Sequence, residues 1–224
     1  MTDESVKKRG RCKLPKLPTV PNQEQDRRQQ LMNAALYLFA SKGYHCTKIS
    51  DVVKSAGVSQ GTFYWYFHSK EQIILELIHD GMEKLTNVIA QGYRKHGGTV
   101  EDMVSSSARL LTELFTFADQ NRNLMALLLM KGQGADPAVR EAVSQTWITF
   151  EEAFKHNIQR ATELGMLPNT NDLSLRANIL VCLITGVLSK WLFGPMHEVD
   201  YQSGYSPAEI AEATAKFEFR GLLG

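Results

Sequence analysis

Apolar residues recur along most of the chain at the spacing of an α-helix rather than that of a β-strand. In the first such stretch Leu31, Ala35, Leu38 and Phe39 stand at i, i+4, i+7 and i+8, so they form one apolar stripe. Gly43 ends this pattern, as glycine often does at a helix C-terminus. No segment alternates with period two between turn signals. The sequence therefore predicts an all-α protein of about nine helices, without a sheet.

Two short helices are predicted after the first one. Thr47 is placed to cap the earlier of them, and Gly57 closes it. Ser59 is placed to cap the second, which spans residues 60–67, and residues 69–72 form a capping box that opens a longer helix. The buried face of the earlier short helix is predicted from residues at i, i+3, i+4 and i+7, which are Ile49, Val52, Val53 and Ala56.

The rest of the chain consists of further predicted helices, separated by glycine, proline and capping residues. Gly97 and Gly98 end the helix that begins near residue 70. Asp136 and Ser206 are each followed by proline, the arrangement expected for an N-cap and a first helical position. These later helices are predicted at about 100–118, 124–130, 137–164, 172–193 and from 207 onward.

The segment 47–67 has the features of a helix-turn-helix (HTH), with two short helices and a glycine in the turn between them. Val58, Phe63 and Phe67 are predicted to face inward. Large aromatic side chains left in water lower solubility, so outward aromatic rings indicate a surface that meets a partner. The residues predicted to point away from the core are Gln60, Gly61, Thr62, Tyr64, Trp65 and Tyr66.

This region resembles the DNA-binding domain of the tetracycline-repressor (TetR) family. The resemblance covers residues 27–78 and is carried by residues 57–67 (GVSQGTFYWYF) and the Ser-Lys-Glu at 69–71. The C-terminal body resembles the family in helix count and length only. The resemblance implies a ligand-responsive transcriptional repressor that is not an enzyme and needs no cofactor. The residues before position 57 that also carry the resemblance are Ala35, Leu38, Phe39, Gly43, Tyr44, Thr47 and Ile49.

The resemblance also implies roles for individual residues. Gln60 and Thr62 would reach base edges, and Gly61 would let the backbone approach the duplex. Phosphate donors such as Lys70 would fix the register without reading sequence. Lys48 and Ser50 depart from the residues that the family often has there, so the operator sequence does not carry over. The full predicted DNA-contacting set is Thr47, Lys48, Ser50, Ser59, Gln60, Gly61, Thr62, Tyr64, Trp65, Tyr66 and Lys70.

Charge supports the same division of the chain. Residues 1–70 carry a net charge of +7 and residues 71–224 a net charge of −6, so only one end is suited to phosphates. Residues 1–22 are polar and rich in proline and basic residues, which predicts a disordered segment that is either a minor-groove arm or a solvated tail. The predicted domains are this arm, an HTH domain at 23–70 and an effector-binding and dimerisation domain at 71–224.

The helical body is predicted to bind a small, largely apolar effector and to form a homodimer. Met and aromatic side chains commonly line apolar cavities, and the ligand-binding candidates are Phe115, Met130, Trp147, Phe150, Phe154 and Asn178. The last two helices are expected to pair with those of a second copy. The predicted interface residues are Ile179, Leu183, Val187, Ile210, Ala213 and Phe217.

Three short segments are similar to known catalytic, metal-binding or phosphate-binding motifs. Residues 57–61 fit G-x-S-x-G, but the hydrolase elbow needs a strand before its serine. Residues 76–79 fit the E-x-x-H of di-iron bundles without a second copy, and residues 131–134 lack the Lys-Ser/Thr end of a phosphate loop. We therefore predict no catalytic or metal site. The alternatives that stay open are a helical enzyme or metalloprotein, and a DNA-binding protein without a ligand.

Cysteine usage and hydropathy predict a cytoplasmic protein. Cys12, Cys46 and Cys182 have no spacing typical of a disulfide framework or a zinc site; Cys46 is a candidate redox sensor and Cys182 a predicted core residue. Residues 1–28 lack the apolar region of a secretory signal. The apolar run 179–186 is shorter than the roughly 20 residues of a membrane span, so we expect a buried core helix there and no membrane partner.

Overall fold

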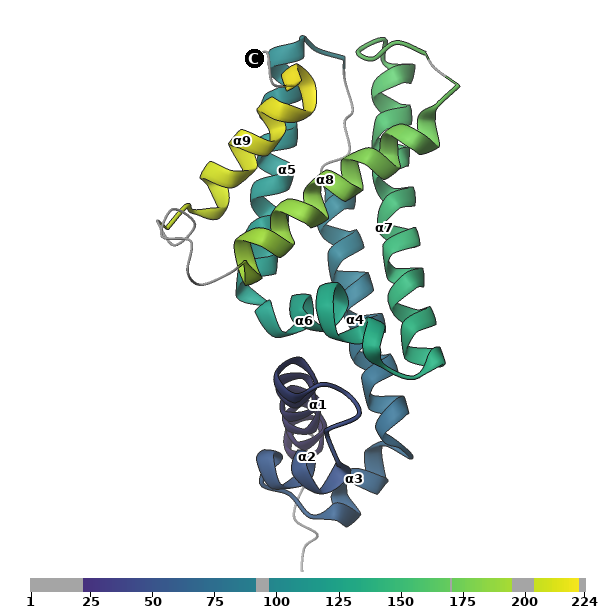
Figure 1. The fold of residues 1–224 in the computed structure, drawn as a ribbon, viewed down its shortest axis with the longest axis vertical. Coiled ribbons are helices and arrows are strands. Elements are labelled where there is room, and N and C mark those ends of the chain that lie inside the picture. Colours follow the sequence, from purple (N-terminus) through teal and green to yellow (C-terminus); the bar gives the residue numbers. More distant parts are fainter. Residues whose placement is uncertain (1–21, 92–96, 170, 195–203, 222–224) are drawn as a thin grey trace, which may run out of the picture.

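A computed structural model describes residues 22–91, 97–169, 171–194 and 204–221 (Figure 1). Within these ranges the chain forms nine α-helices and no strand, which confirms the predicted all-α class. Of the predicted N-terminal arm, only Asn22 belongs to the described residues, and helix α1 begins there. The helices are α1 (Asn22–Lys42), α2 (Ile49–Ala56), α3 (Gln60–Tyr66), α4 (Lys70–Gln91), α5 (Val100–Gln120), α6 (Arg122–Ala126), α7 (Pro137–Glu163), α8 (Leu173–Phe193) and α9 (Pro207–Arg220).

The first three helices form a compact unit at one end of the elongated molecule (Figure 1). Gly57 ends α2 with a φ of 66°, a left-handed conformation that glycine adopts without strain. Ser59 caps α3 as predicted, since its Oγ accepts a hydrogen bond from the backbone N–H of Thr62 at 3.1 Å. Phe63 and Phe67 are fully buried beneath α3. These contacts fix the turn and the tilt of α3.

The cap of α2 differs from the prediction. The N-cap is Lys48, whose backbone N–H donates to Asp51 Oδ2 at 3.0 Å. Thr47 lies one residue earlier, and its hydroxyl donates to the carbonyl of Gly43 at 2.8 Å. The threonine therefore ties the end of the loop to α1, and the helix begins one residue later than a Thr47 cap would place it.

Helix α4 runs from the N-terminal unit into the body, where it packs beside α7 (Figure 1). Ser69 Oγ accepts from the backbone N–H of Gln72 at 3.0 Å, as expected for a cap at this position. Gly81 faces the side chain of Leu124, and a Cβ there would lie 2.6 Å from Leu124 Cδ1. The absence of a side chain at Gly81 thus allows α6 to approach α4 closely.

Above this junction α5 and α9 lie side by side, and α8 crosses between them and α7 (Figure 1). Helix α6 continues into a π-helical turn (Leu127–Lys131) and a 3-10 turn (Gly132–Gly134), where the sequence predicted one short helix. Leu127 and Leu128 of the π-helical turn are buried. The π-helical turn therefore places these two leucine side chains in the hydrophobic core.

Helix α8 is not the buried core helix that its hydropathy predicts. By length and composition it is apolar enough to cross a membrane, yet only 22% of its most apolar window is buried. Leu180, Ile184 and Leu188 face the core, whereas Ile179 is 59% exposed. Cys182, predicted as a core residue, is exposed as well. The apolar residues of α8 therefore lie on two faces, one packed against the core and one exposed in the single chain.

The close packing at Gly132 generates a stability prediction. A Cβ at Gly132 would lie 2.6 Å from Val143 Cγ2 and 2.9 Å from the carbonyl oxygen of Leu127, and the backbone atom has little freedom to move. We expect Gly132→Ala to lower the free energy of unfolding by about 1–3 kcal/mol. Urea unfolding checks this. Gly134→Ala is the matched control, because no atom lies within 4 Å of its added Cβ, and an equal loss in both variants would contradict the packing argument.

Candidate DNA-binding surface and ligand cavity

Helix α3 presents two large aromatic side chains to solvent. Tyr64 is 49% exposed and Trp65 is 77% exposed, although Phe63 between α3 and the core is fully buried. Gln60 and Gly61, in the first turn, are exposed as well. A major groove about 12 Å wide admits a single helix, so an exposed helix with polar residues at its start has the shape for base contacts.

Neighbouring polar groups frame this surface. Lys48 and Ser50, at the start of α2, are exposed. A hydrogen bond of 2.9 Å connects Ser59 Oγ and Thr62 Oγ1. This bond orients the half-buried side chain of Thr62 at the start of α3. Tyr66 is half-buried and packs partly against the core. Most of the residues predicted to contact DNA are therefore exposed on this surface, whereas Tyr66 is turned partly inward.

Two predicted phosphate donors have internal roles. Thr47 is 1% exposed, so its side chain is not presented to a duplex, and this prediction is corrected. Lys70 is half-buried, and its ammonium donates to the carbonyls of Tyr44 at 2.9 Å and of Thr47 at 3.1 Å. The same ammonium lies 4.0 Å from the centre of the Tyr44 ring. Lys70 therefore fastens the loop between α1 and α2 to the start of α4.

The same loop is joined to the body through Asp136, the N-cap of α7. Burial, followed by the negative charge of Asp136 and a hydrogen bond to its carboxylate, raises the pKa of Tyr44 to about 12. His45 Nε2 lies 3.7 Å from Asp136 Oδ1. Since Tyr44 and His45 belong to the N-terminal unit and Asp136 to the body, this cluster is a polar contact between them.

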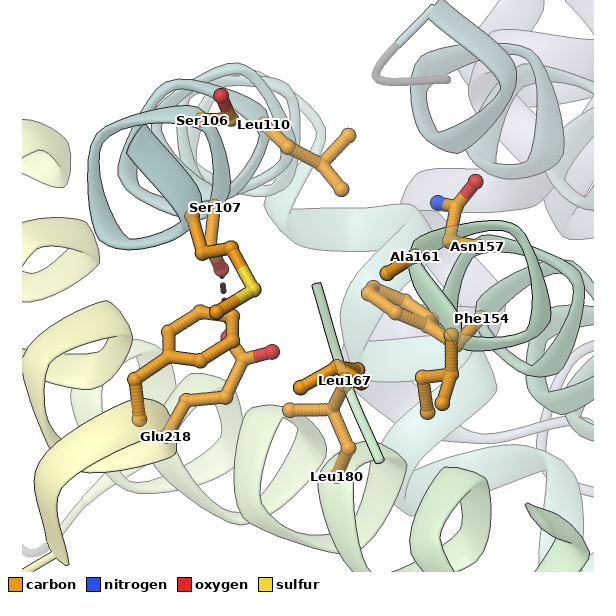
Figure 2. A pocket seen from close by; sticks show the side chains of 12 residues that line it. Ser106, Ser107, Leu110, Phe154, Asn157, Ala161, Leu167, Leu180 and Glu218 are labelled. Atoms are coloured by element: carbon orange, nitrogen blue, oxygen red, sulfur yellow. Dashed lines mark hydrogen bonds between the residues drawn. The ribbon is translucent and has the colours of Figure 1, made fainter. Parts of the chain in front are cut away.

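A cavity of about 80 Å³ lies within the body, between α5, α7, α8 and α9 (Figure 2). Ser107 of α5 donates a hydrogen bond to Glu218 Oε2 of α9 at 2.5 Å on one side of it. Asn157 lies on the opposite side, on α7 (Figure 2). The remaining lining is mainly apolar and includes Met103, Leu110, Phe154, Ile158, Leu180 and Phe219.

Of the six predicted ligand-binding residues, only Phe154 lines this cavity. Phe115 is fully buried with its ring 6.1 Å from that of Trp191, and Met130 is 48% exposed. Asn178 is exposed and donates to Glu151 at 3.1 Å. Trp147 and Phe150 stack edge to face, 5.5 Å apart, as ordinary packing partners.

The sequence argument missed Ser107, Asn157 and Glu218 because it selected large apolar side chains. Glu218 and Ser107 are 111 positions apart, and only the packing of α9 on α5 brings them together. A signal was available in α9, where Glu218 and Phe219 follow the outward-facing Phe217 and therefore fall on a different face of the helix.

The six predicted dimer residues do gather on one surface. An open groove of about 740 Å³ between α8 and α9 is lined by Leu183, Val187, Ile210, Ala213 and Phe217. Ile179 borders the adjoining groove, which shares Leu183 and Phe217. The residues predicted for the dimer interface therefore lie along one open apolar surface, although the sequence assigned α8 to the core.

Residues 31–77 match the family described as bacterial regulatory proteins, tetR family. The chain belongs to the TetR family. It is 26% identical to an uncharacterised HTH-type transcriptional regulator, YdgC of Bacillus subtilis, over 88% of this chain and 92% of that protein. The relatives are transcriptional regulators rather than enzymes, so the hydrolase and di-iron interpretations are set aside.

Two solved structures support the TetR fold over most of the chain. A TetR-family regulator from Syntrophomonas wolfei is 26% identical, with a TM-score of 0.66 over 88% of this chain and 94% of that one. The regulator FadR of Bacillus subtilis, solved in complex with stearoyl-CoA, is 18% identical, with a TM-score of 0.71 over 87% of this chain and 99% of that one. Both likenesses extend from the HTH through the helical body.

The exposed ring of Tyr64 generates a prediction for this TetR-family protein. The DNA for this test is a duplex that the wild-type protein selects from genomic fragments. We expect Tyr64→Ala to weaken the affinity for this duplex by about tenfold, or about 1.4 kcal/mol. Fluorescence anisotropy measures the affinity. The variant should unfold at the wild-type temperature, because half of the side chain is already in water. Ile148→Ala, which truncates an exposed side chain on α7, should leave DNA binding unchanged, and equal losses in the two variants would refute the assignment.

The raised pKa of Tyr44 predicts a pH dependence of stability. The unfolded chain ionises this phenol near pH 10, whereas the folded chain keeps it protonated up to about pH 12. Its contribution is therefore complete below pH 10 and is lost as the pH rises from 10 to 12. Between pH 9 and 11.5 the free energy of unfolding in urea should fall more in the wild type than in Tyr44→Phe. Equal falls in the two proteins would contradict the raised pKa of Tyr44.

Proposed function

We propose that this regulator is a repressor that binds a near-palindromic operator as a homodimer and is released by a small, largely apolar effector. The observation that carries the proposal is the exposed aromatic face of α3, held outward by the buried Phe63. A face of this kind is costly in water and is accounted for by a partner. In a TetR-family regulator that partner is duplex DNA.

In the proposed complex the first turn of α3 reads bases. Gln60 would pair with adenine, and Thr62, oriented by Ser59, would contact a thymine methyl or an exocyclic group. Tyr64 and Trp65 would lie against sugars and methyl groups, while Lys48 and Ser50 would meet phosphates. We further propose that residues 23–70 act as the DNA-binding domain and residues 71–224 as the effector-binding and dimerisation domain. The protein would work in the cytoplasm, where its DNA is.

The proposed dimer uses the open face of α8 and α9. Ile179 and Phe217 are 59% and 42% exposed, and both are large apolar side chains on that face. Two copies related by a two-fold axis would cover this surface as a four-helix interface. Such symmetry places two recognition helices about 34–36 Å apart, in successive major grooves.

Effector release would act through an enlargement of the cavity. A volume of about 80 Å³ is smaller than the roughly 300 Å³ of ordinary ligand pockets, so a ligand would bind only when α7 moves away from α5 and α9. The FadR regulator, which has a similar fold, was solved in complex with stearoyl-CoA, so another protein of this fold binds a large ligand. Preference for the opened arrangement supplies the free energy that shifts the equilibrium.

Helix α7 provides the route from cavity to DNA. It carries Phe154 and Asn157 at the cavity and begins at Asp136, which contacts Tyr44 of the N-terminal unit. Helix α4 packs beside α7 and begins at Lys70, which holds the loop of that unit. A shift of α7 would therefore tilt α4 and change the spacing of the two recognition helices.

The dimer and its DNA are tested together. Footprinting on genomic fragments should reveal a near-palindromic site with half-sites about one helical turn, roughly 34–36 Å, apart. In analytical ultracentrifugation Phe217→Glu should sediment as a monomer, because a charge would be buried at the interface. Its affinity for the operator should fall by more than about tenfold, since one protomer reaches only one half-site.

Ile148→Glu is the control, because it places the same charge on an exposed apolar position of α7. It should remain a dimer and keep wild-type operator affinity. A wild-type chain that sediments as a monomer and still protects a full palindrome would refute the proposed assembly. Extracts of small metabolites that never release the operator would refute the effector.

A further inference from the structure

We infer that the cavity between α5, α7, α8 and α9 takes an apolar ligand that carries one protonated amine, and that Glu218 receives the amine. The inference names the ligand class of the proposed effector site and rests on that proposal. It is carried by the position of the Glu218 carboxylate inside a mainly apolar lining.

Among the described residues, the lining contains a single formally charged side chain, and its charge is negative. Twelve residues in the described part of the chain border the cavity, and Glu218 is the only acidic or basic one of these twelve. The other polar side chains are Ser106, Ser107 and Asn157, which are neutral. A ligand that enters this space therefore meets hydrocarbon on most sides and one carboxylate.

Helix packing holds that carboxylate in place. Ala211 and Ala215 of α9 are fully buried, so α9 lies close against α5. The hydroxyl of Ser107 donates to Oε2 of Glu218 at 2.5 Å, and this bond fixes the position of the carboxylate (Figure 2). The carboxylate points into the space between α5 and α7 (Figure 2).

Electrostatics then discriminate between ligand head groups. In a site of low effective dielectric, an ammonium beside Glu218 gains a charge-assisted hydrogen bond, whereas a carboxylate there is repelled. The rings of Phe154 and Phe219 add faces that attract a cation. Arg176 borders the adjoining pocket that Glu218 also lines, and its side chain is exposed, so water screens its charge. The cavity therefore selects for cations.

The test compares three probes with the same phenyl-(CH2)4 body: 4-phenylbutylamine, 4-phenylbutanol and 5-phenylpentanoate. Calorimetric titration of the full-length protein should give at least about tenfold tighter binding for the amine than for the carboxylate, with the alcohol between them. This comparison requires no variant. Equal affinities, tighter binding of the carboxylate, or no binding by any probe would overturn the inference.

Glu218→Gln assigns the selectivity to one side chain. Glutamine keeps the size of the side chain and an acceptor for Ser107, so the fold should be retained, and thermal unfolding checks this. The variant should lose most of the preference for the amine. Glu212→Gln, on the exposed side of the same helix and paired with Lys216 at 2.7 Å, should keep it. An unchanged preference in Glu218→Gln would overturn the role of this carboxylate.

Operator release is measured separately, so that the two proposals fail in different ways. Release of the operator by the amine, at concentrations that saturate the cavity, supports both. Selective binding of the amine without release supports the ligand class and contradicts effector control through this cavity. Release by other metabolites, with no selective binding of the amine, contradicts the ligand class alone.

Discussion

The burial of Phe63 and Phe67 is the constraint on which the DNA-binding surface depends. A helix of seven residues, such as α3, is far too short to be stable alone in water, so tertiary packing must hold it. Both rings are fully buried, and they lie at i and i+4 on the inner side. Tyr64 and Trp65, which lie between them, are consequently turned outward. The core contact that makes α3 a helix thus also determines which side chains a duplex would meet.

Fixing α3 in its own unit is not sufficient for regulation, because the unit must also respond to the body. Lys70 and Asp136 make that connection, since both contact the segment around Tyr44 while they stand at the beginnings of α4 and α7. Polar contacts of this kind have defined geometry, and a shift of either helix changes them directly. Apolar contacts between α1 and α6 add area to the same junction.

The body leaves apolar surface incompletely packed in two places, the small cavity and the α8/α9 face. The cavity is small and has a carboxylate on its wall, so it is suited to a ligand that brings both hydrocarbon and opposite charge. The α8/α9 face is large and shallow, so it is suited to a second protein surface. Successive residues of α9 line the two, with Phe217 on the face and Glu218 at the cavity.

The sequence by itself determined the helices and the HTH, because periodicity, caps and glycine turns are local signals. Ser59 and Gly57 acted as predicted, as did the alternation of buried and exposed residues along α3. Only the tertiary structure decided that Thr47 is buried and that Lys70 bonds to the loop. It alone also placed Glu218 opposite Asn157. These outcomes depend on contacts between residues far apart in the chain, and the spacing of residue types carries no information about which helix packs beside which.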